Sequence, residues 1–172
     1  MMAVLGFVLV SGLGFAGEDM EHMVPYKGSA EFEKIKSLAG NWQGTDTKDG
    51  KTIPVNTHYA VTSNGSAVVE TEFAGTPGEM VTIYYDKKGK LAMTHYCAIG
   101  NRPEMDLSVS SEKSLTLDFS KDNSTIDAKA DDHMHSLTIE WQGNDKIVQH
   151  WGCYHQGEKN FDTNIELSRV KE

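Results

Sequence analysis

Residues 29–42, SAEFEKIKSLAGNW, contain the point at which the hydrophobic pattern of this chain changes. In the first part, Phe32, Ile35 and Leu38 recur every three positions, and Ser29 stands ahead of them as an N-cap. This spacing predicts one short amphipathic helix from Ser29 to Leu38. After it the period falls to two, and turn residues recur at hairpin spacing, which predicts strands for the rest of the chain.

The segments that follow the helix alternate in polarity and are bounded by turn residues. The predicted strands are 41–48, 53–62, 66–73, 79–85, 90–98, 104–110, 114–119, 125–129, 134–142, 145–153 and 162–170. The short connections make neighbours in sequence neighbours in the sheet, and closure removes the two edges that an open meander would expose. We therefore predict an all-β fold, a single antiparallel up-and-down β-barrel of about ten strands. The short N-terminal helix is expected to plug one end.

The composition fits one globular domain and excludes several partners. The chain has 172 residues, of which 38% are hydrophobic, and its 16 Lys and Arg against 25 Asp and Glu give a net charge of −9. A chain of this length buries enough surface to fold without a disulfide scaffold. A negative surface repels phosphate backbones and anionic headgroups, so we expect no nucleic-acid partner.

The first residues have the pattern of an export signal. Residues 1–16, MMAVLGFVLVSGLGFA, carry no charge and are too short to span a bilayer. We therefore expect a signal peptide cleaved near Ala16, a flexible lead over 17–28 and a barrel domain over 29–172. The protein would be exported, with no membrane insertion of the mature chain. The two cysteines fit such a compartment, and their pairing stays open.

Alternation along the strands predicts which side chains face the barrel interior. On the second predicted strand this is the face of Thr57 and Tyr59, and on the third it is the face of Val69 and Phe73, which leaves Glu70 and Glu72 toward solvent. The other expected lumen residues are Met93, His95, Cys97, His135, Leu137, Gln149, Trp151 and Cys153. An interior that is polar in part predicts either a ligand or a set of side chains, such as His95 with Tyr59 or Gln149, that satisfy one another.

Two parts of the sequence resemble known barrels. The run Leu38-Ala39-Gly40-Asn41-Trp42, a helix that leads into Gly-x-Trp, resembles the opening of lipocalins and the wider calycin barrels. The resemblance implies that Arg169 in the last strand stacks across Trp42. The stretches VTSNGSAVVETEF, GTPGEMVTIYYD and LAMTHYCAIGNRPEM resemble a bacterial lipocalin-like family of unassigned function, distantly related to nitrobindin-type haem-binding barrels. The lipocalin Thr-Asp-x-Tyr motif is absent.

We predict that the barrel binds a small hydrophobic or amphipathic molecule in its lumen, as a monomer or weak homo-oligomer. The expected lining is Thr57, Tyr59, Met93, His95, Cys97, His135, Gln149 and Trp151. One alternative is a haem or transition-metal protein that uses His95, His133 and His135, since imidazole ligates both. A second alternative is an enzyme with a Cys97/His nucleophile.

Overall fold

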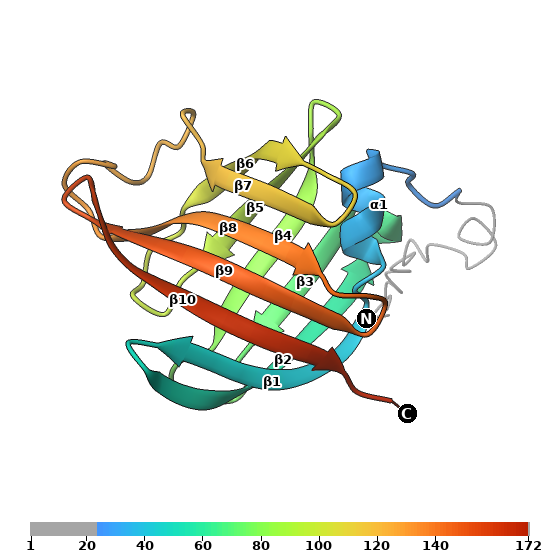
Figure 1. Cartoon of the computed structure of the whole chain (residues 1–172). Coiled ribbons are helices and arrows are strands. Elements are labelled where there is room, and N and C mark those ends of the chain that lie inside the picture. Colours follow the sequence, from blue (N-terminus) through green and yellow to red (C-terminus); the bar gives the residue numbers. More distant parts are fainter. Residues whose placement is uncertain (1–23, 172) are drawn as a thin grey trace, which may run out of the picture.

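The computed structural model describes residues 24–171 and confirms an antiparallel up-and-down barrel of ten strands with one short α-helix (Figure 1). Each strand pairs with its neighbours in sequence, and the last strand closes the circle against the first. The elements are α1 (Ala30–Lys36), β1 (Gly40–Lys48), β2 (Lys51–Thr62), the 3-10 turn η2 (Ser63–Gly65), β3 (Ala67–Glu72), β4 (Met80–Lys87), β5 (Lys90–Tyr96), β6 (Glu104–Ser110), β7 (Ser114–Phe119), β8 (His133–Trp141), β9 (Lys146–His155) and β10 (Glu158–Arg169).

One predicted strand, 125–129, is wrong: these residues belong to the long connection between β7 and β8. The side chain of Asn123 accepts hydrogen bonds from the backbone N–H of Thr125 at 2.9 Å and of Ile126 at 3.1 Å. Asn side chains compete in this way with a strand ladder for backbone donors. The alternating pattern of this segment is therefore overridden by local turn chemistry.

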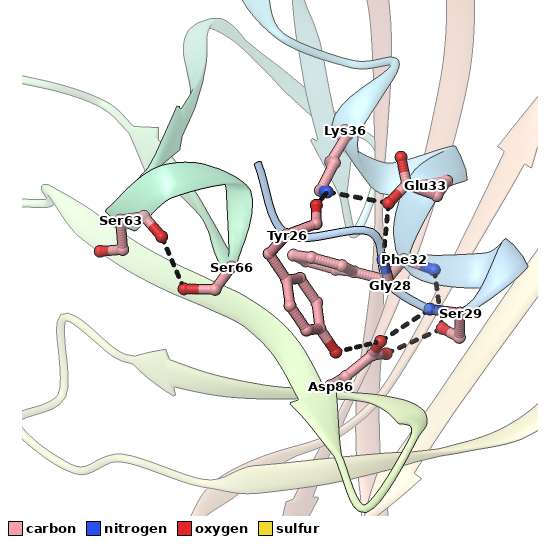
Figure 2. Close-up of polar contacts among 9 residues, drawn as sticks. All are labelled: Tyr26, Gly28, Ser29, Phe32, Glu33, Lys36, Ser63, Ser66 and Asp86. Carbon is pink, nitrogen blue, oxygen red and sulfur yellow. Dashed lines mark hydrogen bonds and ion pairs between the residues drawn. The ribbon is translucent and has the colours of Figure 1, made fainter. Parts of the chain in front are cut away.

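Helix α1 closes one end of the barrel and is fixed there by Asp86 on β4 (Figure 2). Ser29 caps the helix by accepting from the N–H of Phe32 at 3.1 Å. Asp86 accepts from the backbone N–H of Ser29 at 2.7 Å, from its hydroxyl at 2.8 Å and from the Tyr26 hydroxyl at 3.1 Å. The helix residues Phe32 and Ile35 are fully buried. The last part of the expected flexible lead is thus held against the barrel.

The start of β1 completes this closed end. The guanidinium carbon of Arg169 lies 4.4 Å from the ring centroid of Trp42, so the stacking that the resemblance implied is present. Arg169 also donates to the backbone carbonyls of Ala39 at 2.7 Å and Ser37 at 2.8 Å, just beyond the helix. The indole N–H of Trp42 donates to the Leu38 carbonyl at 2.7 Å. These contacts and helix α1 therefore close this end of the barrel.

The inward face of β3 is the opposite of the predicted one. Glu70 and Glu72, expected in solvent, are 0% and 1% exposed, and they pair across the ladder with the inward residues Tyr59 and Thr57. Strands that ended at 62 and began at 66 would have paired Tyr59 with Val69. In the structure Thr62 pairs with Ala67 instead. A shift of one residue turns every side chain of a strand to the other face.

A β-bulge changes the predicted alternation on β8. Met134 pairs with Cys153 and Ser136 with Gly152, which leaves His135 as an extra residue. A bulge of this kind breaks the two-residue period. Leu137 is fully buried as predicted, but His135 no longer shares its face.

The predicted signal peptide and its cleavage near Ala16 lie outside the described residues. Within residues 24–171, no helix has both the length and the apolar character needed to cross a membrane.

Candidate functional site

A cavity of about 370 Å³ lies at the end of the barrel opposite α1. In an up-and-down barrel, the C-terminal ends of odd strands and the N-terminal ends of even strands meet at the same end. The cavity is lined by such ends. Lys48 ends β1, Phe73 and Cys97 directly follow β3 and β5, and Met80, Met134 and Phe161 lie near the starts of β4, β8 and β10. Its volume lies within the roughly 300–1,000 Å³ usual for small-molecule sites.

The walls of the cavity are mainly apolar, with acidic groups set among them. The apolar lining is Phe73, Met80, Ile99, Met134, Trp151, Phe161 and Ile165. The acidic lining is Asp46, Glu72 and Asp132. Lys48, near the mouth, is the cation among the described lining residues, and its ammonium lies 3.2 Å from the Phe161 ring centroid. The site therefore combines a hydrophobic enclosure with negative charge.

His95 is the histidine of this cavity. Its Nδ1 lies 2.8 Å from the Thr82 hydroxyl, which leaves Nε2 as the ring nitrogen free to meet a ligand. The ring stands 4.7 Å from the Trp151 ring, centroid to centroid. Burial lowers the pKa of His95 to about 4, so the imidazole is neutral at pH 7. It can offer a hydrogen bond but no positive charge.

Beneath the cavity lies a closed polar network around Glu70. Its carboxylate accepts hydrogen bonds from the hydroxyls of Tyr59 and Tyr84, each at 2.6 Å, and from the Gln149 amide at 2.5 Å. Burial raises the pKa of Glu70, while these three hydrogen bonds act in the opposite direction. Trp151 joins this network to the cavity wall by donating to Gln149 Oε1 at 3.1 Å.

Glu72 lies two residues further along β3, and its carboxylate has no such partners. Both oxygens are buried, and neither has a hydrogen bond to any described residue. Burial raises the pKa of Glu72 well above its usual range, and the nearby Glu70 and Asp46 carboxylates raise it further. An unsatisfied buried acceptor costs about 1–3 kcal/mol, so this is the group in the cavity that a bound molecule would satisfy.

The structure divides the eight predicted lining residues into three sets: those that line the cavity, those buried deeper in the barrel, and His135, which lies away from the cavity. His95, Cys97 and Trp151 line the cavity. Thr57, Tyr59, Met93 and Gln149 are buried deeper in the barrel and do not line it. The expected pairing of His95 with Tyr59 or Gln149 is not found, because His95 pairs with Thr82. Instead, the Gln149 amide donates to the Tyr59 hydroxyl.

His135 does not line the cavity, contrary to expectation. It stacks on Tyr154 with centroids 3.8 Å apart, and its Nδ1 lies 2.9 Å from Nε2 of His133. His133 in turn contacts Phe119 and bonds the Asp131 carbonyl. The predicted convergence of these two histidines with His95 is therefore absent, and residues 24–171 contain no group of three or more His, Cys, Asp or Glu side chains placed to hold a metal ion.

The cavity lining does not fit haem. His95 is the one predicted axial ligand that lines it. Haem carries two propionates, and the described lining offers them Lys48 as a cation against the acidic side chains of Asp46, Glu72 and Asp132. Like charges in a site of low dielectric constant repel strongly.

Cys97 and His95 do not have the properties of an activated nucleophile and its base. Cys97 is a free thiol. Burial raises its pKa, whereas a nucleophilic thiol needs a lowered pKa. His95, with a pKa of about 4, is a weak base at neutral pH. The arrangement suits binding better than acyl transfer.

Sequence reasoning missed Asp46 and Glu72, the two acidic groups that lie on β1 and β3 in the cavity wall. Asp46 accepts a hydrogen bond from Thr163. The signal that could have found Glu72 was the register of the β2–β3 hairpin, because a residue paired with an inward one also points inward.

No protein-family model and no curated protein matches this sequence. Among solved structures, the crystal structure of Rv2717c from M. tuberculosis is similar, with a TM-score of 0.60 and 12% identity over 84% of this chain and 100% of that chain. A protein of unknown function from the DUF3598 family of Nostoc punctiforme is also similar, with a TM-score of 0.54 and 10% identity over 79% of this chain and 49% of that one. This chain thus spans about half the length of the second protein. At these identities the likeness establishes the barrel fold.

Proposed function

We propose that this protein is an exported barrel that binds one small amphipathic molecule in the cavity opposite α1. The apolar body of the ligand would lie against Trp151 and Phe161, and its polar end would reach His95 and Glu72. The lipocalin-like resemblance and the predicted signal peptide support a carrier outside the cytoplasm.

The observation that carries this proposal is the Glu72 carboxylate, buried and without a partner, in the wall of a mainly apolar cavity of about 370 Å³. A barrel whose interior needed only to be full would place an aliphatic side chain there, because a buried acceptor without a donor destabilises the fold. The deeper polar groups around Glu70 need no ligand, since they satisfy one another. Glu72 has no such internal partners among the described residues, so its burial is explained by a bound ligand.

A fluorescent apolar probe, N-phenyl-1-naphthylamine, tests the proposal. We expect saturable one-site binding to the full-length protein, with enhanced probe fluorescence. The variant Met80→Trp puts a larger side chain into the cavity wall and should abolish binding. Val109→Trp is the matched control, because Val109 on β6 is 55% exposed and lies outside the cavity lining. Equal binding by both variants would place the probe elsewhere and overturn the proposal.

An absorption spectrum of protein purified from its natural export route tests the haem alternative. We expect no Soret band and no spectral change on titration with ferric haem. A Soret band that shifts in a His95→Ala variant would replace the carrier by a haem protein.

A further inference from the structure

The contrast between Glu70 and Glu72 identifies the kind of polar group that the cavity lacks. The two carboxylates lie on the same inward face of β3, and both are at most 1% exposed. Glu70 receives three donors, whereas neither oxygen of Glu72 receives one from any described residue. Its cross-strand partner Thr57 makes no bond to it. The missing group is therefore a hydrogen-bond donor for the Glu72 carboxyl group.

The charges around Glu72 indicate that this donor is positive. Asp46 and Asp132 share the cavity lining with Glu72, and the Glu70 carboxylate is close enough to raise the pKa of Glu72. His95 is neutral, and the Lys48 ammonium lies over Phe161 near the mouth. A buried carboxylate is stabilised most by a partner of opposite charge that also donates hydrogen bonds. No described residue of the cavity supplies that partner to Glu72.

The walls fit the remainder of such a ligand. Trp151, Phe73 and Phe161 present aromatic rings in the lining, and aromatic faces attract cations as well as apolar groups. An anionic head would face Glu72 and Asp46 without a buried cation to offset them. A neutral alcohol could donate only one hydrogen bond, whereas a protonated primary amine donates three.

We propose that the cavity selects organic cations in which a protonated primary amine is attached to an apolar body, with Glu72 as the carboxylate that pairs with the ammonium. This assignment rests on the proposed function, because it names the ligand class of the same cavity. The ammonium favours the charged form of Glu72, so the proton that burial holds on this carboxyl is released to solvent as the ligand binds. Glu72 is then the residue that determines specificity, while the apolar walls supply affinity common to all amphipathic ligands.

Three probes with the same eight-carbon chain test the assignment: octylamine, octanol and octanoate. They are titrated into the full-length protein at pH 7.5 in 0.15 M salt, below their aggregation concentrations, by calorimetry. We expect octylamine to bind at least about tenfold more tightly than octanol, since hydrogen bonds to charged groups contribute about 1.5–3 kcal/mol and tenfold is 1.4 kcal/mol. Octanoate should bind most weakly.

The variant Glu72→Gln should remove the advantage of octylamine over octanol and leave the octanol affinity within about twofold. Glu166→Gln is the control, because Glu166 is an exposed acid on β10 outside the cavity. It removes one negative charge from a protein of net charge −9, and so reports any unspecific attraction of cations. We expect it to leave the octylamine affinity unchanged.

The outcomes separate this inference from the proposed function. Equal affinity for octylamine and octanol, or tighter binding of octanoate, overturns the assignment of an amine and leaves the carrier standing. Failure of all three probes together with N-phenyl-1-naphthylamine overturns the carrier itself. The ranking of the three probes on the unmodified protein decides the matter even if Glu72→Gln fails to fold.

Discussion

Glu70 and Glu72 point into the same barrel from the same strand, and Glu70 accepts three hydrogen bonds while Glu72 accepts none from the described residues. Two residues of the same type, at 0% and 1% exposure, therefore have opposite effects on the stability of the unliganded protein. The first completes a network, and the second is held in the fold at a cost in stability. Proteins tolerate such a cost at sites of function more readily than elsewhere.

We expect Glu72→Gln to stabilise the unliganded protein, by an amount on the order of 1 kcal/mol at pH 8. The pKa of Glu72 is raised in the fold, so the native state holds its proton when the unfolded chain has lost it. Stability due to this group therefore falls as the pH rises above the unfolded pKa of about 4.3. Urea denaturation at pH 4.5 and pH 8 should show a larger gain at pH 8. A loss of stability at pH 8 would contradict the interpretation of Glu72 as unpartnered.

We expect the change Glu70→Leu to have the opposite sign. It leaves the hydroxyls of Tyr59 and Tyr84 without their acceptor, while the Gln149 amide keeps its hydrogen bond to the Tyr59 hydroxyl. Each orphaned hydroxyl costs about 1–3 kcal/mol, so the loss should be roughly 2 kcal/mol or more. Tyr84→Phe removes a single donor, and we expect a smaller loss of about 1 kcal/mol. Urea denaturation of the unmodified protein and of the two variants, followed by tryptophan fluorescence, measures both losses of stability. Equal losses in the two variants would show that the network is not centred on Glu70.

His95 should make the fold sensitive to acid. Its pKa is lowered from 6.5 to about 4 by burial, so the unfolded state binds a proton more readily than the native state. The stability that this neutral histidine contributes is present above pH 6.5 and is lost as the pH falls toward 4. By linkage, the loss is about 3 kcal/mol. Denaturation from pH 7.5 to 4 should show this dependence in the natural protein and a flatter one in His95→Gln. Identical pH profiles would indicate that the imidazole is protonated without penalty.

The fold could be predicted from sequence to a greater depth than the site. Periodicity and turn residues suffice for the strands, because each hairpin is local and consecutive strands are neighbours. Residue orientation depends on finer features. Ser66 belongs to the turn before β3, and this one-residue difference in register turns Glu72 to the inside. His135 is an extra residue in a bulge, and the bulge turns its side chain away from the cavity. Neither a turn length nor a bulge leaves a reliable signal in polarity alone, and an acidic pair on a strand favours solvent on every hydrophobic scale.

The Trp42–Arg169 contact should contribute to stability without affecting binding. The guanidinium lies over the indole and also donates to the Ala39 and Ser37 carbonyls. We expect Arg169→Ala to lower the free energy of unfolding by about 1–2 kcal/mol. Arg169→Lys should restore only part of it, because an ammonium lacks the planar fork. The cavity is at the other end of the barrel, so the affinity for N-phenyl-1-naphthylamine should not change; a large change would show that the two ends are coupled.

The cavity thiols offer a direct readout of occupancy. Cys97 and Cys153 are free and line the cavity, and burial raises the pKa of both. Since the thiolate is the reactive form, we expect iodoacetamide at pH 8 to alkylate them more slowly than free cysteine. A saturating ligand should slow the reaction further by covering the lining. Mass spectrometry of Cys97→Ser and Cys153→Ser assigns the rate of each remaining thiol. Alkylation at the rate of free cysteine, unchanged by ligand, would show that the thiols are open to solvent and that the ligand binds elsewhere.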